Sequence, residues 1–307
     1  MTLHGLSSVT VGVPDPIAAR DYYTEFGLAP AAGGWLATRD GGAQLRLVAA
    51  PARRLAELTV AADDPDDLDS VAARLRALGL PVTPTADSVS AMEPVAGFRA
   101  VVRIATRLAQ PQAPAIRYNG PGRIERRDAR APGVTREGPV RPRKLGHVVL
   151  GSTDPEAIGR FFVEGLGFKV SDEIKGQGAF LRCSTDHHNV LVVRAPVNFL
   201  HHTSWQVDDV DEVGRGATAM LTDHPERHVW GLGRHHAGSN FFWYLKDPAG
   251  TFSEYYSDMD CIVDDQLWKP DVFDGARGLL NWGPPPPPSF LRPDDLAALM
   301  TGAHKAS

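Results

Sequence analysis

An internal repeat constrains the fold of this chain more strongly than any other feature of its sequence. Asp15-Pro16 and Asp154-Pro155 each follow a run of alternating small and apolar residues and open a helical pattern. Asp is a favoured helix N-cap and Pro a favoured first helical residue. Asp64 and Asp209 mark a second helix start in each half, so a strand–helix–strand unit occurs four times. Repetition at roughly 50 to 60 residues indicates a duplicated supersecondary unit. We therefore predict two similar α+β domains, each with a curved, mostly antiparallel sheet that encloses a cavity.

The composition excludes several classes of function. The 307 residues carry a net charge of −5, which gives no basic field for nucleic acid. No apolar run approaches the roughly 20 residues of a membrane span, and the first residues lack the pattern of a signal peptide. The two cysteines, Cys183 and Cys261, form no metal or redox motif. We predict a cytoplasmic protein with no nucleic-acid or membrane partner, and exposed sheet edges favour a homo-oligomer.

A β-hairpin is predicted between residues 238 and 258. Phe241–Lys246 is aromatic and apolar, as in a half-buried strand. The following Asp-Pro-Ala-Gly has the residue order of a type I turn, and Thr251–Ser257 is the return strand. Glu254 shares a face with the aromatic residues Phe252 and Tyr256. A buried carboxylate there needs a cation, a hydrogen-bond donor or a metal as its partner.

When the two halves of the sequence are aligned at their helix starts and at the hairpin turn, three residues of metal-binding type, Glu254 and two histidines, fall at repeat positions of the second half. The matched positions of the second half are His147, His202 and Glu254, and those of the first half are Ser8, Glu57 and Val101. Two imidazoles and one carboxylate on separate strands form a facial triad that suits Fe(II), and Mn(II) accepts the same ligands. The first half cannot form a comparable site. Strand alternation places His201 and His202 on opposite faces, so that only one can bind the metal, and the spacing to Asp209 favours His202.

Other polar residues in aromatic surroundings are candidates for acid–base and substrate-binding roles. His188 lies on the strand before His202 and could move a proton between substrate and oxygen, although the adjacent His187 could instead be the inward residue. His235 and Tyr244 could hydrogen-bond the substrate oxygens, and His236 is the alternative to His235.

The segment from Leu145 to Asp258 resembles the catalytic domain of the type I extradiol ring-cleaving dioxygenases, in the vicinal oxygen chelate (glyoxalase–bleomycin-resistance–dioxygenase) superfamily. The motifs that carry the resemblance are Gly-His-Val-Val-Leu (146–150), His-His-Asn-Val-Leu (187–191), Leu-His-His-Thr (200–203), Gly-Leu-Gly-Arg-His (231–235) and Asp-Pro-Ala-Gly-Thr-Phe-Ser-Glu-Tyr (247–255).

The resemblance implies a fold and a set of roles. The implied fold has two paired βαβββ modules in each domain, with curved mixed sheets. The implied iron ligands are His147, His202 and Glu254. His188 is the implied acid–base, and His235 and Tyr244 are the implied substrate donors. The implied reaction is oxidative ring cleavage of a catechol with O2, as in the catabolism of aromatic compounds.

Four segments are predicted along the chain. Residues 1–107 form a first domain of the same superfamily without a metal site, and residues 145–258 form the metal-binding catalytic domain. Residues 108–144 form a linker rich in Pro and Arg, and residues 259–307 form a Pro-rich tail. The apolar residues of the tail between Cys261 and Phe290 lead us to expect that it packs over the mouth of the catalytic domain.

Two other classes of function remain open. One is a metal-dependent isomerase, lyase or transferase of the same fold, which would turn over without oxygen. The other is a protein that binds a small aromatic molecule without metal.

Overall fold

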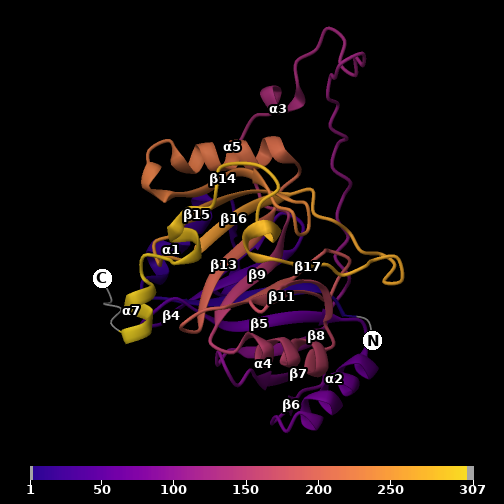
Figure 1. Ribbon diagram of the computed structural model, residues 1–307, viewed down its shortest axis with the longest axis vertical. Coiled ribbons are helices and arrows are strands. Elements are labelled where there is room, and N and C mark those ends of the chain that lie inside the picture. The colour runs from indigo at the N-terminus through magenta and orange to yellow at the C-terminus, as the bar shows by residue number, and fades with distance from the viewer. Residues whose placement is uncertain (1–2, 303–307) are drawn as a thin grey trace.

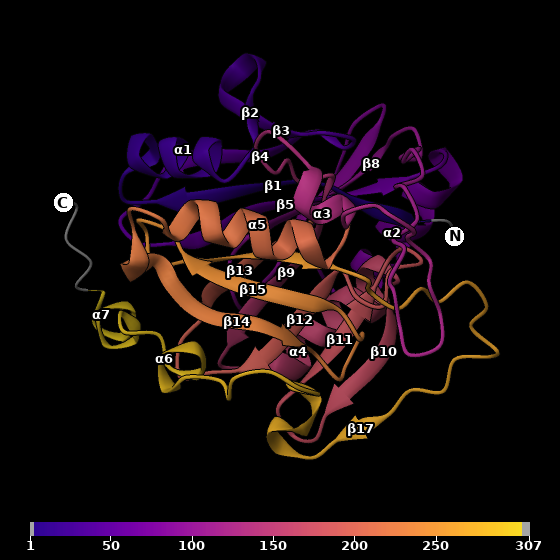
Figure 2. The same ribbon diagram turned by 90° about the horizontal axis from the view of Figure 1, so that it is seen from above.

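The computed structural model describes residues 3–302, so the first two residues of the predicted first domain and the last five of the predicted tail lie outside the described residues. Two mixed sheets of eight and nine strands dominate the molecule. The sheets lie against each other as two layers (Figure 2). The predicted α+β architecture with two similar halves is confirmed.

Each half contains two βαβββ modules, as predicted. The first module holds β1 (Leu3–Val13), α1 (Pro16–Glu25), β2 (Ala29–Pro30), the 3-10 turn Ala32–Gly34, β3 (Trp35–Thr38) and β4 (Gly42–Ala49). The second holds β5 (Arg54–Ala62), α2 (Pro65–Ala77), β6 (Thr83–Pro84), β7 (Ser88–Met92) and β8 (Arg99–Ile104).

The second half repeats this order. Its first module holds β9 (Lys144–Ser152), α4 (Pro155–Arg160), a π-helical turn (Phe161–Leu166), β10 (Lys169–Ile174), β11 (Gly178–Arg182) and β12 (Val190–Arg194). Its second module holds β13 (Phe199–Gln206), α5 (Val210–Leu221), the 3-10 turn Pro225–Arg227, β14 (His228–Arg234), β15 (Phe241–Lys246) and β16 (Phe252–Ser257).

The strand order is the same in both sheets. It is β2-β3-β4-β1-β5-β8-β7-β6 in the first and β14-β15-β16-β13-β9-β12-β11-β10 in the second, where β17 (Val272–Phe273) of the tail adds one more strand beside β10. In each sheet the two modules therefore join through an antiparallel pair of their first strands, β1 with β5 and β9 with β13.

The predicted helix caps explain where the helices begin. Asp15 accepts hydrogen bonds from the backbone N–H groups of Ile17 and Ala18, and Asp154 accepts one from Ala157. Such caps satisfy N–H groups that have no partner within the helix. The helix predicted to begin at Asp154-Pro155 is regular only in its first part, because a wider π-helical turn follows α4. This turn buries the rings of Phe161 and Phe162, and both contact Phe98 of the first half.

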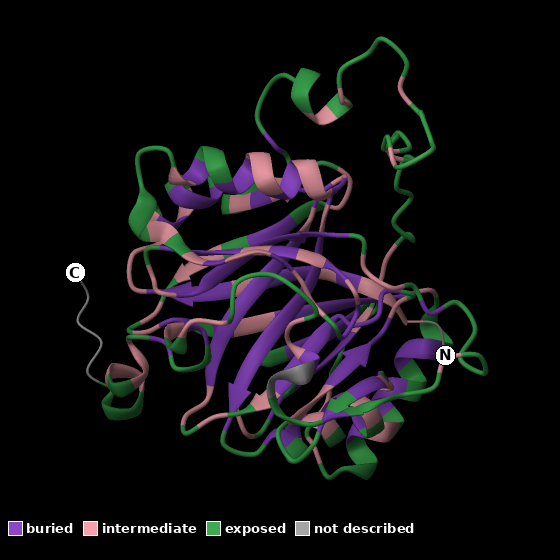
Figure 3. Cartoon of the chain, turned by 45° about the horizontal axis from the view of Figure 1, so that its top comes forward, coloured by how far each residue is buried: buried purple, intermediate pink, exposed green. Residues whose placement is uncertain are grey.

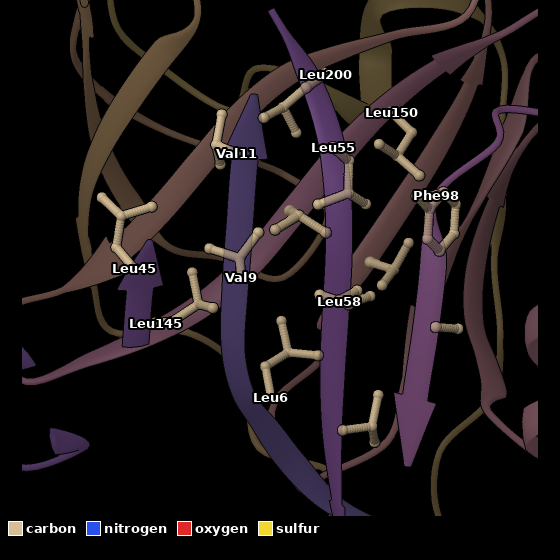
Figure 4. Packing of buried hydrophobic residues seen from close by; sticks show 14 of the residues in the cluster. Leu6, Val9, Val11, Leu45, Leu55, Leu58, Phe98, Leu145, Leu150 and Leu200 are labelled. Atoms are coloured by element: carbon tan, nitrogen blue, oxygen red, sulfur yellow. The ribbon is translucent and has the colours of Figure 1, made fainter. Parts of the chain in front are cut away.

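One hydrophobic core connects the two halves. Leu6, Val9 and Leu58 of the first sheet belong to the same buried cluster as Leu145 and Leu150 of the second (Figure 4). Removing this apolar surface from water stabilises the pairing of the halves, since burial contributes about 25 cal/mol per Å². We conclude that the first half supports the second through a shared core.

The strand β16 is buried along its whole length, because the first half covers one of its faces. The ring of Tyr255 stacks on that of Phe26 with 3.8 Å between centroids, and its hydroxyl donates to the Phe26 carbonyl at 2.6 Å. The hydroxyls of Ser253 and Tyr22 hydrogen-bond at 2.6 Å. Because Ser253 and Tyr255 face the first half, Glu254 between them faces the opposite side of the sheet.

Two segments lie outside the modules. The predicted linker runs as a largely exposed arm that projects from the body of the molecule and contains only the short helix α3 (Pro132–Thr135) (Figures 1 and 3). The tail includes the 3-10 turn Gly275–Gly278, α6 (Pro288–Leu291) and α7 (Leu296–Thr301). Among the described residues, no helix has the length and apolar character needed to cross a membrane.

Candidate metal centre

Three adjacent strands bring the predicted ligands together. In the register of the second sheet, Ser204 on β13 is paired with both His147 on β9 and Glu254 on β16, and His202 lies two residues before Ser204. The first sheet has the same register, with Thr59 paired with Ser8 and Val101. The positions matched from sequence are therefore equivalent in the structure.

The ligand-type atoms of His147, His202 and Glu254 converge within 4.8 Å of one another, and all three side chains are buried. Glu254 Oε2 lies 3.1 Å from His147 Nε2 and 3.6 Å from His202 Nε2. His202 Nε2 and Glu254 Oε2 are buried without a hydrogen-bond partner. Because an unpaired buried carboxylate is costly, and two imidazoles with one carboxylate suit a divalent transition metal, the described residues fit such an ion.

The other carboxylate oxygen of Glu254 has a partner that was not predicted. The Asn240 side-chain amide donates to Glu254 Oε1 at 3.2 Å and is fully buried. This bond orients the carboxylate so that Oε2 remains directed at the two imidazoles. Outer partners of this kind commonly hold metal ligands in place.

A β-bulge changes the expected arrangement of His201 and His202. The pairing of β13 with β9 shifts between Leu200 and His202, so His201 is the extra residue. Strict alternation is therefore interrupted, and both rings line the same cavity. His201 Nδ1 lies 2.8 Å from His202 Nδ1, and His201 Nε2 lies 2.7 Å from the carbonyl oxygen of Phe290.

This chain of contacts assigns the protons on His202. A carbonyl oxygen only accepts, so His201 Nε2 carries the proton and His201 Nδ1 accepts from His202 Nδ1–H. His202 Nε2 is then left with its lone pair, as a metal ligand requires. Burial lowers the pKa of His201 to about 4, so the ring is neutral at neutral pH.

His188 faces the same cavity, and His187 lies behind it. The His188 ring is 4.2 Å from that of His147 between centroids, whereas His187 is fully buried. Of the two residues left open by the sequence, His188 is therefore the one that borders the cavity. Burial, and then the neighbouring His147, lower the pKa of His188 well below its ordinary value, which favours a neutral ring.

His235 and Tyr244 form a hydrogen-bonded pair beside the triad. His235 Nε2 lies 2.8 Å from the Tyr244 hydroxyl and 3.8 Å from Glu254 Oε1, and His235 Nδ1 contacts the Leu279 carbonyl. Burial and then the charge of Glu254 raise the pKa of Tyr244, so its hydroxyl stays protonated. The alternative His236 is exposed and lies against Phe273.

The triad borders a cavity of about 1070 Å³ with mainly apolar walls. The second sheet contributes Val149, Ile174, Phe180, Leu191 and Val193. The tail contributes Leu279, Phe290, Leu291, Leu296 and Met300. Leu279 and Phe290 belong to the segment that was expected to cover the cavity, whereas the other three residues lie beyond it. Other apolar residues of the tail, Val263, Leu267 and Trp282, are exposed instead.

A buried arginine of the first half anchors the tail. Arg53 donates to both carboxylate oxygens of Asp295, from Nε at 2.7 Å and from Nη2 at 2.8 Å. Its Nη1 donates to the carbonyl of Leu200, directly before the histidine pair. The roles of Arg53 and Asn240 were not predicted from the sequence, because each residue acts through a partner distant in the chain. The adjacent pair His201 and His202 was a local sign of an irregular strand, but strand alternation was assumed there and the bulge was not predicted.

A model of one protein family matches the second half of the chain. Residues 144–255 match the family model described as the Glyoxalase/Bleomycin resistance protein/Dioxygenase superfamily. Metapyrocatechase 2 of Cupriavidus necator is 38% identical over 155 residues, which are 50% of this chain and 48% of that protein. An iron-dependent extradiol dioxygenase of Rhodococcus jostii is 30% identical over 139 residues, 40% of this chain and 46% of that protein. The chain thus spans about half the length of the curated relatives it matches.

Solved structures align over nearly the whole chain. The Mn(II)-bound glyoxalase from Novosphingobium aromaticivorans superimposes with a TM-score of 0.73 and 27% identity, and the alignment covers 93% of each chain. The arrangement of both halves therefore occurs in a known protein, although the matched segment of the family model is confined to the second half.

Proposed function

We propose that this chain is a metal-dependent extradiol dioxygenase that opens the ring of a catechol with O2, and that its residues 144–255, which match the family model, are the part of the chain that makes it a member of the Glyoxalase/Bleomycin resistance protein/Dioxygenase superfamily. The observation that carries the proposal is the buried convergence of His147, His202 and Glu254 beside a cavity that His188 and Tyr244 also line. The relatives named metapyrocatechase and extradiol dioxygenase support it.

The metal that we propose is Fe(II), with Mn(II) as the second choice. Two imidazoles and one carboxylate accept both ions, and the relatives include an iron-dependent enzyme and a manganese-bound one. The bound metal would supply a Lewis-acidic centre with open positions for catechol oxygens and O2. We assign the three ligand positions to His147, His202 and Glu254.

The roles of the other cavity residues follow from their contacts. His188 accepts the proton of a substrate hydroxyl and returns it to the ring-opened product, because it is a neutral imidazole beside His147. Tyr244 keeps its proton and offers this O–H to a substrate oxygen in place of His235 Nε2. The apolar walls exclude water and contact the aromatic ring.

The remaining segments have supporting roles. We propose that residues 1–107 are a scaffold domain without a metal site, that residues 108–144 are a linker, and that residues 145–258 are the catalytic domain. In this assignment the tail, residues 259–307, forms part of the cavity wall. A cytoplasmic location and a homo-oligomeric assembly stay predictions.

The main test is oxygen uptake with a panel of catechols, using protein purified without oxygen and reconstituted with either Fe(II) or Mn(II). Stoichiometric uptake with a new visible absorption band of the ring-opened product is the expected result. Glu254→Gln should abolish uptake and lower the bound metal. Glu57→Gln is the matched control, because Glu57 occupies the position in the first half that corresponds to His202.

A second candidate is a metal-dependent isomerase or lyase, which the alignment with a Mn(II)-bound glyoxalase favours. This class turns over without oxygen, so the same metal-loaded protein should be assayed anaerobically with a glutathione hemithioacetal. Anaerobic turnover with no oxygen uptake on any catechol would replace the dioxygenase proposal.

A further inference from the structure

The candidate acid–base His188 is the end of a buried chain of hydrogen bonds. His188 Nδ1 lies 3.1 Å from His187 Nδ1, and His187 Nε2 lies 3.0 Å from Asp172 Oδ2. The second carboxylate oxygen, Asp172 Oδ1, accepts the backbone N–H of Asp271 at 2.8 Å. Asp172, His187 and His188 are all at least nine-tenths buried. The chain therefore runs from β10 through the loop before β12 to the cavity.

For a neutral His187, the chemistry of the groups assigns every proton in this chain. Both oxygens of Asp172 act as acceptors, so His187 Nε2 must donate. A neutral imidazole carries one N–H, so His187 Nδ1 is an acceptor and His188 Nδ1 must donate to it. The remaining nitrogen, His188 Nε2, is left with its lone pair.

The surroundings hold this arrangement in place. The ring of His187 packs against Trp268 and Phe180, with centroids 5.3 and 5.7 Å away. Gly238 has φ +78°, and a Cβ there would lie 3.2 Å from His187 Nδ1 and 3.4 Å from His188 Nδ1. The glycine thus provides the backbone conformation and the space that the contact between the two rings requires.

We propose that Asp172 and His187 are positioning residues that fix the tautomer of His188, so that His188 Nε2 is free to accept a proton from the substrate. This inference rests on the proposed function, since it assigns His188 as the acid–base. When the substrate O–H bond breaks, its proton forms a new N–H bond at His188 Nε2. The positive ring is then stabilised through His187 by the carboxylate of Asp172, and the same proton passes to the product.

The decisive variant is Asp172→Asn. The Asp271 N–H needs an acceptor, so the amide oxygen should remain on that side and the NH2 group should turn toward His187 Nε2. His187 Nε2 then accepts, His187 Nδ1 donates, and His188 must carry its proton on Nε2. The substitution should therefore invert the tautomers of both histidines with little change in shape.

The tautomers can be measured independently of activity, by 15N–1H correlation of the imidazole groups in labelled protein loaded with the diamagnetic ion Zn(II). In the wild type we expect the proton on His188 Nδ1, and in Asp172→Asn on His188 Nε2. With the Fe(II) protein, kcat should fall at least about 100-fold, as for loss of general acid–base catalysis, with KM and bound metal within twofold. Glu173→Gln is the matched control, because it removes the same charge from the exposed side chain next to Asp172 on β10 and should change neither tautomer nor kcat.

A second pair of variants, both at His187, distinguishes loss of the hydrogen-bond chain from misfolding. The amide of His187→Gln can donate to Asp172 and accept from His188 Nδ1, so this variant should retain the His188 tautomer and most of kcat. His187→Leu breaks the chain and should lose kcat. Unchanged tautomers in Asp172→Asn, or a kcat within twofold of the wild type, would overturn the proposal. If the wild type itself consumes no oxygen with any catechol, the proposed function fails, whereas the tautomers still test the hydrogen-bond chain.

Discussion

Replacement of Arg53 by Met should loosen the tail and destabilise the protein. The side chain of Arg53 is 0% exposed, and it forms two hydrogen bonds of 2.7 and 2.8 Å with Asp295 as well as one with the buried carbonyl of Leu200. Its guanidinium also lies 4.9 Å from the ring centroid of Phe199. Met retains much of the apolar stem but removes every donor.

The magnitude follows from the groups that lose a partner. A buried carbonyl without a donor costs about 1–3 kcal/mol. Breaking a buried ion pair costs about 3–5 kcal/mol, but the Asp295 side chain is 20% exposed and can regain water. We therefore expect Arg53→Met to lower the free energy of unfolding by about 3 kcal/mol, near the lower end of that range.

Urea unfolding followed by circular dichroism measures this loss, and limited proteolysis of the tail measures its release. Arg54→Met is the matched control, because Arg54 is an exposed neighbour whose side chain donates a hydrogen bond to the Gly97 carbonyl. It should cost less than about 1 kcal/mol. A double-mutant cycle with Asp295→Asn should give a coupling above about 0.5 kcal/mol. A loss in Arg53→Met no larger than that of the control, together with unchanged proteolysis, would refute the anchoring role.

Two further predictions concern the hairpin turn and the first ligand strand. Burial raises the pKa of Asp247 from 3.8 to about 6, so the folded state loses stability as the pH rises from about 4 through 6. Over that range the free energy of unfolding of Asp247→Asn should rise by up to about 3 kcal/mol relative to that of the wild type. A difference between the two proteins that stays constant with pH in urea unfolding would contradict this. Gly146 directly precedes His147, and in Gly146→Ala the new Cβ would lie 2.1 Å from the hydroxyl of buried Tyr256. This overpacking should lower the free energy of unfolding by about 1–3 kcal/mol and lower the metal content measured by mass spectrometry. The control Gly159→Ala, with no atom within 4 Å of its Cβ, should bind metal as the wild type does.

Much of the fold could be predicted because its signals are local and repeated. The Asp caps before α1 and α4 and the Asp-Pro-Ala-Gly turn before β16 each depend on a few consecutive residues. The fourfold module pattern then made the halves comparable, and the strand register bears out the positions matched with Ser8 and Val101. The π-helical turn after α4 was not predicted, because packing against Phe98 of the first half accompanies it.

The sequence by itself determined the modules, the hairpin and the residue types at the candidate metal centre, because these depend on periodicity, caps and an internal repeat. Only the tertiary structure decided which groups form hydrogen bonds with the residues around that centre. The partner of His187 is 15 residues away, that of His201 is 89 away, and that of Arg53 is 242 away. A hydrogen bond across such separations depends on which segments pack together, and a one-residue bulge at His201 reverses the direction that alternation predicts.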